Sequence, residues 1–244
     1  MRDLLLAADS HLRADDADTE RFLRFLRREG SRAAAVVLAG DIFDLWVAWE
    51  GLELPYHRAV IGAIDDLRRA GVEVRYVEGN RDYFVGERYG RGPFTEVAAE
   101  SLRVRHAHLE LHVAHGDLVN ARDRQYRAWR RLSRSSAVQG GFRLLPSRAA
   151  ARLSGFLERK MRTTNRAYRV SFPEAQAAQY ARRAFAAGAD AVVLGHFHEA
   201  RVTEFPAGAG AGPGRLFVLP GWREERRYLR FDGAGEATFV EFTG

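Results

Sequence analysis

The sequence contains no cysteine and no long apolar run. None of its 244 residues carries a thiol, which excludes disulfide bonds, thiolate metal ligands and cysteine nucleophiles and fits a reducing compartment. The N-terminal stretch MRDLLLAADSH holds only a short apolar run, too short for the core of a secretory signal or for a membrane span. A hydrophobic content of 46% is enough for one large core. We therefore expect a cytoplasmic protein with a single domain over residues 1–244.

Lysine is almost absent as well, and nearly every basic residue is arginine. The formal net charge of the chain is +6. Residues 121–170 hold 13 arginines and one lysine against Asp123 and Glu158, a charge of +12, so the remaining residues sum to −6. This concentration of positive charge in one segment predicts a surface for an anionic partner.

Short apolar runs recur along the chain and predict β-strands. They cover residues 4–8, 34–39, 72–77, 109–114, 190–194, 215–219, 227–231 and 238–242. Apolar residues at helical spacing precede glycines 30, 71 and 188, the positions where a helix C-terminus favours glycine. Strands that alternate with helices predict an α/β protein with a largely parallel sheet. The last three runs are separated by short turns, so we expect them to pair antiparallel.

Polar side chains stand at the ends of five of these runs. They are Asp9 and His11, Asp41 and Asp44, Asn80, His115 and Asp117, and His196 and His198. Since ligands gather at the carboxyl ends of parallel strands, we expect these groups to converge. Each fragment alone is typical of a turn or a helix cap, but together they predict one metal site. The other four histidines, at 57, 106, 108 and 112, are assigned to the surface or to packing.

The residue types fit a pair of divalent cations. Two such ions about 3.5–4 Å apart orient a water molecule and clamp phosphate oxygens during in-line displacement. A mixed set of nitrogen and oxygen ligands without sulfur favours Mn²⁺, Fe or Zn²⁺ over Cu(I). Asn80 supplies a neutral amide oxygen, which adds no negative charge to a site that must also receive a phosphate.

These motifs resemble those of the calcineurin-like binuclear metallophosphoesterases. The blocks DSH, GDIFD, GNRD, HGD and GHFH occur in the family's order between residues 9 and 198. The resemblance implies a four-layer αββα sandwich, which is an α/β (α+β) fold. It also implies the ligands of two metal ions, with Asp41 as the bridge: Asp9, His11, Asp41 and His198 for one ion, and Asp41, Asn80, His115 and His196 for the other.

Arg81 departs from the general family pattern, in which a histidine assists the leaving group. Arginine keeps its charge, so it cannot act as that acid, but it can direct two donors at a phosphate. The stretches GNRDYFVG and HGDLVNARDRQYRAWRR, and Trp46 at the end of GDIFDLW, resemble the UDP-2,3-diacylglucosamine pyrophosphohydrolase branch of lipid A synthesis. This resemblance implies hydrolysis of the pyrophosphate bond of that nucleotide sugar, or of a close lipid-linked one, to UMP and 2,3-diacylglucosamine 1-phosphate.

The same resemblance predicts which residues act on the substrate. The expected catalytic residues are Asp41, Arg81 and His196. The expected substrate contacts are Asn80, Arg81, Asp123, Tyr126, Arg162, Asn165 and His196. Arg162 and Asn165 stand where the branch has a Ser/Asn/Lys set, whose lysine has no clear counterpart in this sequence.

The basic segment at about residues 121–171 is expected to form an inserted helical cap. Trp129 and Leu132 lie three apart on one predicted helix, and residues 153, 156 and 157 form an apolar stripe on another. One reading is a helical hairpin that packs this stripe on the domain. The other is a cap whose apolar face receives acyl chains while its arginines meet anionic lipid, peripherally, at the inner face of the cytoplasmic membrane.

Two other functions remain open from the sequence alone. One is a binuclear metallophosphoesterase that acts on another phosphodiester, a nucleotide or a nucleic acid, with the arginine-rich segment gripping a polyanion. The other is a non-catalytic scaffold with a decayed site, against which the complete set of seven ligands argues. No feature predicts an obligate protein partner.

Overall fold

Two β-sheets form the centre of the molecule. The computed structural model describes residues 2–14, 16–121, 123–144, 172–206 and 213–244. One sheet has six strands, in the order β13 (Ala237–Glu241), β12 (Arg227–Phe231), β1 (Leu4–Ala7), β2 (Ala35–Leu38), β4 (Glu73–Val77) and β6 (Glu96–Ala98). The other has five, in the order β10 (Arg201–Phe205), β11 (Gly214–Val218), β9 (Ala191–Leu194), β8 (Leu109–Ala114) and β7 (Ser101–His106). A small third sheet pairs β3 (Trp46–Val47) with β5 (Asp82–Tyr83).

The centre of each large sheet is parallel and its edges are largely antiparallel. Strands β1, β2, β4 and β6 are parallel neighbours, as are β8, β9 and β11, whereas β12, β13, β7 and β10 pair antiparallel. The predicted parallel arrangement is therefore confirmed for the strands that carry the polar ends. The predicted antiparallel pairing of the last three runs is correct for β12 and β13 but wrong for β11, which pairs with β9 and β10. The short helix α8 (Trp222–Glu225) follows β11, and the chain then enters the other sheet at β12.

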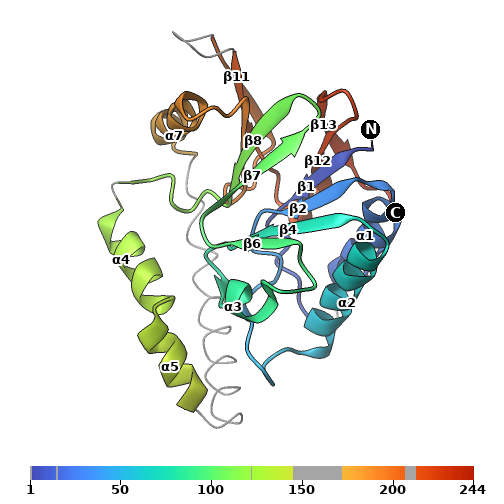
Figure 1. The fold of residues 1–244 in the computed structure, drawn as a ribbon, viewed down its shortest axis with the longest axis vertical. Coiled ribbons are helices and arrows are strands. Elements are labelled where there is room, and N and C mark those ends of the chain that lie inside the picture. The colour runs from blue at the N-terminus through green and yellow to red at the C-terminus, as the bar shows by residue number, and fades with distance from the viewer. Residues whose placement is uncertain (1, 15, 122, 145–171, 207–212) are drawn as a thin grey trace.

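Alternating side chains along the strands place each sheet between two apolar layers. Leu4 and Leu6 of β1 belong to the core between the sheets, with Val193 of β9. Leu5 of the same strand belongs to the core shared with α1 and α2. Val192 of β9 packs with the small residues of α7. Since successive side chains of a strand point to opposite faces, the layers are helices, sheet, sheet and helix, which confirms the predicted αββα sandwich (Figure 1).

The helices form where the apolar spacing predicts them. The ones that cover the sheets are α1 (Ala17–Arg28), α2 (Pro55–Arg69) and α7 (Glu174–Ala186); a 3₁₀ turn covers Gly30–Arg32, and α3 is Val85–Tyr89. Gly71 and Gly188 follow the C-caps of α2 and α7 with φ of 81° and 89°, as the left-handed end of a helix requires. Gly30 differs, because it begins the 3₁₀ turn after α1.

The predicted cap segment contains two described helices. They are α4 (Arg124–Ser133) and α5 (Ser136–Leu144), which extend away from the sheets in Figure 1. The second apolar stripe predicted for the cap, at residues 153, 156 and 157, lies outside the described residues. The prediction of a single domain with an inserted cap stays a prediction. In the part of the chain that the structure describes, no helix is both long enough and apolar enough to cross a bilayer.

Candidate metal centre

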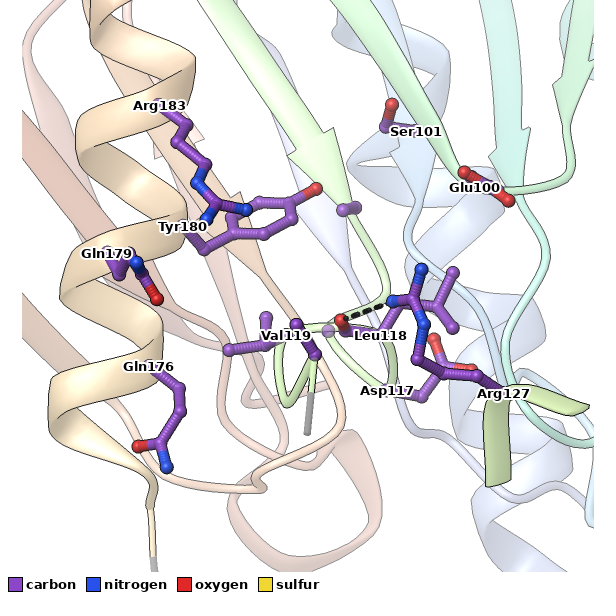
Figure 2. A pocket seen from close by; sticks show the side chains of 13 residues that line it. Glu100, Ser101, Asp117, Leu118, Val119, Arg127, Gln176, Gln179, Tyr180 and Arg183 are labelled. Atoms are coloured by element: carbon purple, nitrogen blue, oxygen red, sulfur yellow. Dashed lines mark hydrogen bonds between the residues drawn. The ribbon is translucent and has the colours of Figure 1, made fainter. Parts of the chain in front are cut away.

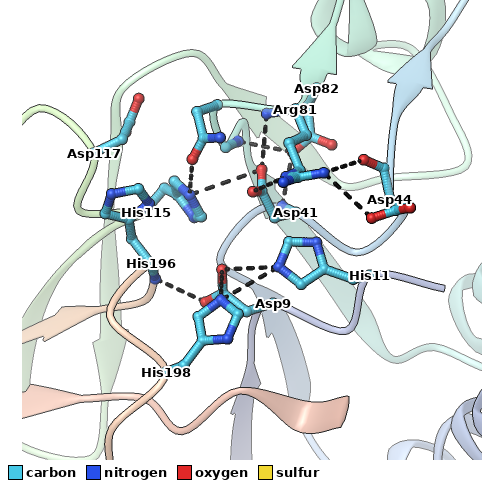
Figure 3. A network of polar contacts seen from close by, with 12 residues as sticks. Asp9, His11, Asp41, Asp44, Arg81, Asp82, His115, Asp117, His196 and His198 are labelled. Atoms are coloured by element: carbon cyan, nitrogen blue, oxygen red, sulfur yellow. Dashed lines mark hydrogen bonds and ion pairs between the residues drawn. The ribbon is translucent and has the colours of Figure 1, made fainter. Parts of the chain in front are cut away.

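The polar side chains at the strand ends meet between the two sheets. Asp9 and His11 follow β1, Asp41 follows β2, and Asn80 follows β4, and these three strands are parallel neighbours. His115 follows β8, and His196 and His198 follow β9, its parallel neighbour in the other sheet. Figure 3 shows most of these side chains pointing toward a common space. Residues scattered over most of the chain are thus brought together by the order of the strands.

The backbone at this centre adopts unusual conformations. Five candidate ligands have positive φ, namely Asp9 (53°), His11 (42°), Asp41 (53°), His196 (74°) and His198 (52°). Among the described residues, only three other non-glycine positions have positive φ, at Phe84, Ala107 and Arg226. Such conformations cost free energy and persist where the surrounding structure enforces them, often at functional sites. The turns that follow β1, β2 and β9 therefore hold their side chains in place at a cost in stability.

One group of candidate ligands consists of Asp9, His11 and His198. The Nε2 atoms of His11 and His198 lie 3.3 Å apart, and Asp9 Oδ1 lies 3.3 Å from His198 Nε2 and 3.9 Å from His11 Nε2. Asp9 Oδ1 is buried and lacks a hydrogen-bond partner among the described residues. Two imidazole nitrogens and a carboxylate oxygen that face one another in this way fit a divalent cation, which accepts electron pairs from all three.

A second group consists of Asp41, Asn80 and His115. His115 Nε2 lies 3.1 Å from Asn80 Oδ1 and 3.7 Å from Asp41 Oδ1. Its Nδ1 lies 2.8 Å from the carbonyl oxygen of Ala39, an acceptor, so Nδ1 carries the proton and Nε2 offers its lone pair to the centre. Gly40 makes this approach possible, because a Cβ atom there would lie 2.6 Å from His115 Nδ1 and its φ is +88°.

Among the described residues, Asp9 is the carboxylate that belongs to both groups, since it also lies near Asp41 and His115. The family resemblance implies Asp41 as the bridge, and Asp41 lies near Asp9 and His115. His196 stands beside them: its backbone N–H donates to Asp9 Oδ2 at 2.7 Å, and its ring lies 5.1 Å from that of His115 between centroids. The assignment of individual ligands to each ion stays a prediction.

Two carboxylates that sequence reasoning left without a role support these ligands. Asp82, which is fully buried, accepts hydrogen bonds from the backbone of Asp41 and Gly79 and from the Tyr76 hydroxyl. Glu224 of α8 lies 3.3 Å from His198 Nδ1, so it turns the Nε2 of that histidine toward Asp9. Partners of this kind orient metal ligands. Asp82 closes the GNRD block, a signal already present in the sequence, whereas Glu224 lies outside every motif.

The charges at the centre shift the pKa values of its groups. Burial raises the pKa of Asp41 to about 7, and the repulsion of Asp82 and Asp9 adds to this against the attraction of His115. Burial lowers the pKa of His196 to about 4. Burial also opposes the charge on His198, but the attraction of Asp9 and Glu224 raises its pKa to about 10. Asp9, Asp41 and Asp82 repel one another in this buried space, and a bound cation would relieve that repulsion.

Arg81 lies inside the same site. Its side chain is 5% exposed. Nη1 donates to the carbonyl and carboxylate oxygens of Asp44 at 2.8 and 3.2 Å, and Nε lies 3.6 Å from Asp41 Oδ2. Its backbone N–H donates to Asp41 Oδ1 at 2.9 Å. The guanidinium therefore adds a fixed positive charge beside the candidate ligands.

Two of the other predicted substrate contacts, Asp123 and Tyr126, lie at the start of α4. Asp123 caps α4 by accepting from the Tyr126 backbone at 2.8 Å, and the Tyr126 hydroxyl donates to the Asp117 carboxylate. Arg162 and Asn165 lie outside the described residues. Three of the histidines assigned to packing have structural partners: His57 at Leu54, His106 at Asp232 and His112 at Tyr180.

A polar cavity of about 240 Å³ adjoins the loop that follows His115. It lies between that loop and α7, as Figure 2 shows, and Arg127 and Arg183 bring two guanidinium groups to its wall. Asp117 lines it as well, but none of the seven candidate metal ligands does. It is therefore a hollow distinct from the space between the ligands.

The arrangement fits hydrolysis of a phosphate ester or anhydride. It offers two groups of candidate nitrogen and oxygen ligands, several buried carboxylates and a permanent positive charge on Arg81 beside them. These are the elements that two-metal phosphoryl-transfer sites require.

Comparisons with known proteins point the same way. The family model described as calcineurin-like phosphoesterase matches residues 3–200. A curated protein named UDP-2,3-diacylglucosamine hydrolase from Ralstonia nicotianae is 31% identical over 233 residues, covering 88% of this chain and 82% of that protein. A protein of the same name from Klebsiella pneumoniae is 30% identical and covers 91% of both. Another from Edwardsiella ictaluri is 29% identical, covering 95% of this chain and 89% of that protein.

Proposed function

The chain belongs to the calcineurin-like phosphoesterase family, and from that premise we propose that it hydrolyses the pyrophosphate bond of UDP-2,3-diacylglucosamine. The products would be UMP and 2,3-diacylglucosamine 1-phosphate, a step of lipid A biosynthesis. The observation that carries the proposal is that two groups of metal-competent side chains lie beside Arg81, where strands of both sheets end. Relatives named UDP-2,3-diacylglucosamine hydrolase that match almost the whole chain support this substrate, or a close lipid-linked nucleotide sugar.

Two divalent metal ions fit the centre, and Mn²⁺ is the first candidate, with Fe or Zn²⁺ as others. We assign Asp9, His11 and His198 to one ion and Asn80, His115 and His196 to the other, with Asp41 between them. When bound, such a pair supplies Lewis-acid chemistry: it activates a water molecule and neutralises charge on the phosphate oxygens.

The protein's own groups have separate tasks in this proposal. Arg81 stays charged at every ordinary pH, so it stabilises negative charge that develops on the phosphate and does not protonate the leaving group. The pKa of His196 is lowered to about 4 by burial, so its ring is neutral at neutral pH and can hold an ion or steady a phosphate oxygen. We assign the bridge to Asp41, as the family resemblance implies, with Asp9 beside it.

Helix α4 supports a lipid-linked substrate. Arg130, one of several arginines in this helix, is only 5% exposed. Trp129 and Leu132 of the same helix are 57% and 59% exposed. A helix of a soluble protein normally places these residue types the other way round. Apolar side chains held on the surface of the cap favour contact with acyl chains.

The charge of the cap segment supports contact with a membrane. Residues 121–170 carry a formal charge of +12, and each basic residue near an anionic bilayer contributes about 1 kcal/mol of attraction. We place this peripheral contact at the inner face of the cytoplasmic membrane, where a substrate with acyl chains is embedded.

The proposal is tested by comparing two substrates. The Mn²⁺-loaded protein should hydrolyse UDP-2,3-diacylglucosamine with a far higher kcat/KM than bis-p-nitrophenyl phosphate, a diester without sugar or acyl chains. A preference for the generic diester would instead favour a phosphodiesterase with another substrate. Nucleic acid should not compete with the nucleotide sugar, although the arginine-rich cap makes that control necessary.

A further inference from the structure

We propose that Arg130 and Arg134 of the cap are positioning residues for one half of the metal centre. They join the loop that carries Asn80 to the loop that carries His115, so that docking of α4 sets the affinity of this half for its ion. The inference rests on the proposed two-metal centre and adds to it a link between cap and ligands.

Arg130 contacts three segments at once. Its Nη2 donates to the carbonyl oxygens of Glu78 at 3.1 Å and Ala99 at 2.6 Å. Its Nη1 donates to the carbonyl oxygen of Gly79 at 3.3 Å and to the Asp117 carboxylate. An arginine that is 5% exposed and meets four acceptors is held in a single geometry.

Arg134, one helical turn later, binds the same loop at positions before and after Asn80. Its Nη2 donates to the carbonyl oxygens of Gly79 at 2.6 Å and Asp82 at 2.7 Å. Its guanidinium carbon lies 4.9 Å from the centre of the Tyr83 ring. The backbone immediately before Asn80 and two residues after it is therefore bonded to the cap.

Asp117 connects the same arginine to His115. Asp117 lies two residues after His115, its side chain is 4% exposed, and it pairs with Arg130 and Tyr126, both from α4. Through these two contacts the Asp117 carboxylate holds the loop after β8 against α4.

The two loops follow strands of different sheets, so a contact that joins them also holds the two sheets together at this point. Asn80 follows β4 in the six-stranded sheet and His115 follows β8 in the five-stranded sheet. Hydrogen bonds within a sheet fix neighbouring strands of that sheet, not the distance between sheets. Yet Asn80 Oδ1 and His115 Nε2 must stay close, and they lie 3.1 Å apart. Arg130 spans both loops from outside the centre.

The other half of the centre is held by different contacts. Asp9 is oriented by the His196 backbone and His198 by Glu224 of α8. In the described ranges, neither Arg130 nor Arg134 makes a hydrogen bond to Asp9, His11 or His198. Loss of the arginine contacts should therefore affect one ion and spare the other.

The test is a titration of the metal-free full chain with Mn²⁺, by calorimetry and by electron paramagnetic resonance. Wild type should bind two ions. In Arg130→Gln we expect one ion to bind about 10–100-fold more weakly, the usual effect of losing a partner of a ligand, while the other binds as in wild type. The Mn²⁺ concentration for half-maximal activity should rise, with KM for the nucleotide sugar unchanged at saturating Mn²⁺.

Two further variants sharpen the result. Arg130→Lys keeps the charge opposite Asp117 but cannot reach all four acceptors, so its weaker site should lie between wild type and Arg130→Gln. Arg131→Gln changes the next residue of α4, which is exposed, and should bind both ions as wild type does. If Arg130→Gln fails to fold, Arg134→Gln decides, because it leaves the Arg130–Asp117 pair intact and should weaken the same ion by a smaller factor.

The outcomes separate the inference from the function. If the wild-type protein binds fewer than two ions, the proposed two-metal centre itself is wrong. Wild type that binds two ions, with both retained at full affinity in a folded Arg130→Gln or Arg134→Gln variant, would overturn the positioning role alone. Equal weakening of both ions would overturn it too, since that is the mark of a general loss of structure.

Discussion

At the scale of single residues, the decisive side chain is Arg81. It is buried beside Asp41 and Asp44 and carries the permanent positive charge of the site. Arg81→Ala should lower kcat for the nucleotide sugar by about 10²–10³-fold, because a preorganised group for developing negative charge is lost. Asp44 keeps its ion pair with Arg13, at 3.0 Å, so we expect the variant to fold. The measurement is steady-state kinetics with metal analysis of the same sample, which should still show two ions.

Asn80→Ala, at the adjacent position, is the matched control. Asn80 supplies an oxygen 3.1 Å from His115 Nε2, so its removal should weaken one ion at least as much as loss of an outer partner, about 10–100-fold. Arg81→Ala should therefore lower the rate without loss of metal, whereas Asn80→Ala should weaken metal binding. An Arg81→Ala protein that loses metal, or an Asn80→Ala protein that keeps both ions at full affinity, would show that their roles have been misassigned.

The positions of the candidate ligands follow from the sequence because each stands directly after a buried strand. Of the two supporting carboxylates, Asp82 stands in the GNRD block, but the position of Glu224 near the site cannot be predicted from the sequence. Glu224 orients His198 across the fold from a short helix near the C-terminus, and no local pattern marks it. The left-handed backbone conformation at Asp9, His11 and Asp41 cannot be predicted from the sequence either, because none of these residues is glycine.

At the scale of elements, α2 predicts a dependence of stability on pH. His57, at its third position, is 5% exposed, and its Nδ1 accepts from the Leu54 backbone at 3.0 Å. Burial lowers its pKa from 6.5 to about 4. Because the unfolded chain binds this proton more readily, the contribution of His57 is complete above pH 6.5 and is lost as the pH falls toward 4. Between about pH 7.5 and pH 5 it should amount to about 2 kcal/mol of unfolding free energy.

The check is urea unfolding at both pH values for wild type and His57→Gln. Glutamine at this position can accept the same backbone N–H in a capping box, but it does not titrate. The variant should lose about 2 kcal/mol less than wild type on acidification. An identical pH dependence of the two proteins would show that His57 is not held neutral in the fold.

Changes in helix α4 should affect the lipid-linked substrate and leave the reaction with a substrate without acyl chains unchanged. Trp129 and Leu132 are exposed on it, and a side chain of this kind contributes about 1.5–3 kcal/mol when fully buried. The double change Trp129→Ser with Leu132→Ser should therefore raise KM for UDP-2,3-diacylglucosamine by about tenfold or more. The rate with bis-p-nitrophenyl phosphate, which has no acyl chains, should stay the same.

Val202 offers a matched control for this experiment. It is 48% exposed and lies on β10, an edge strand outside the cap. Val202→Ser removes exposed apolar surface of a similar kind and should leave KM for the lipid-linked substrate unchanged. Equal effects of the cap and β10 variants would contradict a specific contact between α4 and acyl chains.

The strands that carry the site are predictable from the sequence, whereas the apolar runs do not mark β7 and β10. Strands β1, β2 and β9 are buried on both faces and read as continuous apolar runs. Strands β4 and β8 alternate along most of their length, but each ends on two consecutive buried apolar residues. β7 and β10 lie at sheet edges. In β7, buried Leu102, Val104 and His106 alternate with more exposed polar residues. A search for apolar runs overlooks this two-residue period.

At the scale of the whole molecule, function depends on how two sheets face each other. The polar strand ends predict a shared site, but not the distance between the sheet that carries Asn80 and the sheet that carries His115. That distance depends on contacts between elements far apart in sequence, such as Arg130 with Glu78 and Asp117. One interpretation of the sequence directs the arginines of the predicted cap toward anionic lipid, and the burial of Arg130 shows that this does not hold for all of them.

The most direct test of the account is anomalous X-ray diffraction from crystals grown with Mn²⁺. Two anomalous peaks are predicted about 3.5–4 Å apart, one among Asp9, His11 and His198 and the other among Asn80, His115 and His196, with Asp41 touching both. A single peak, or peaks outside these side chains, would contradict the binuclear centre on which the proposed hydrolysis depends.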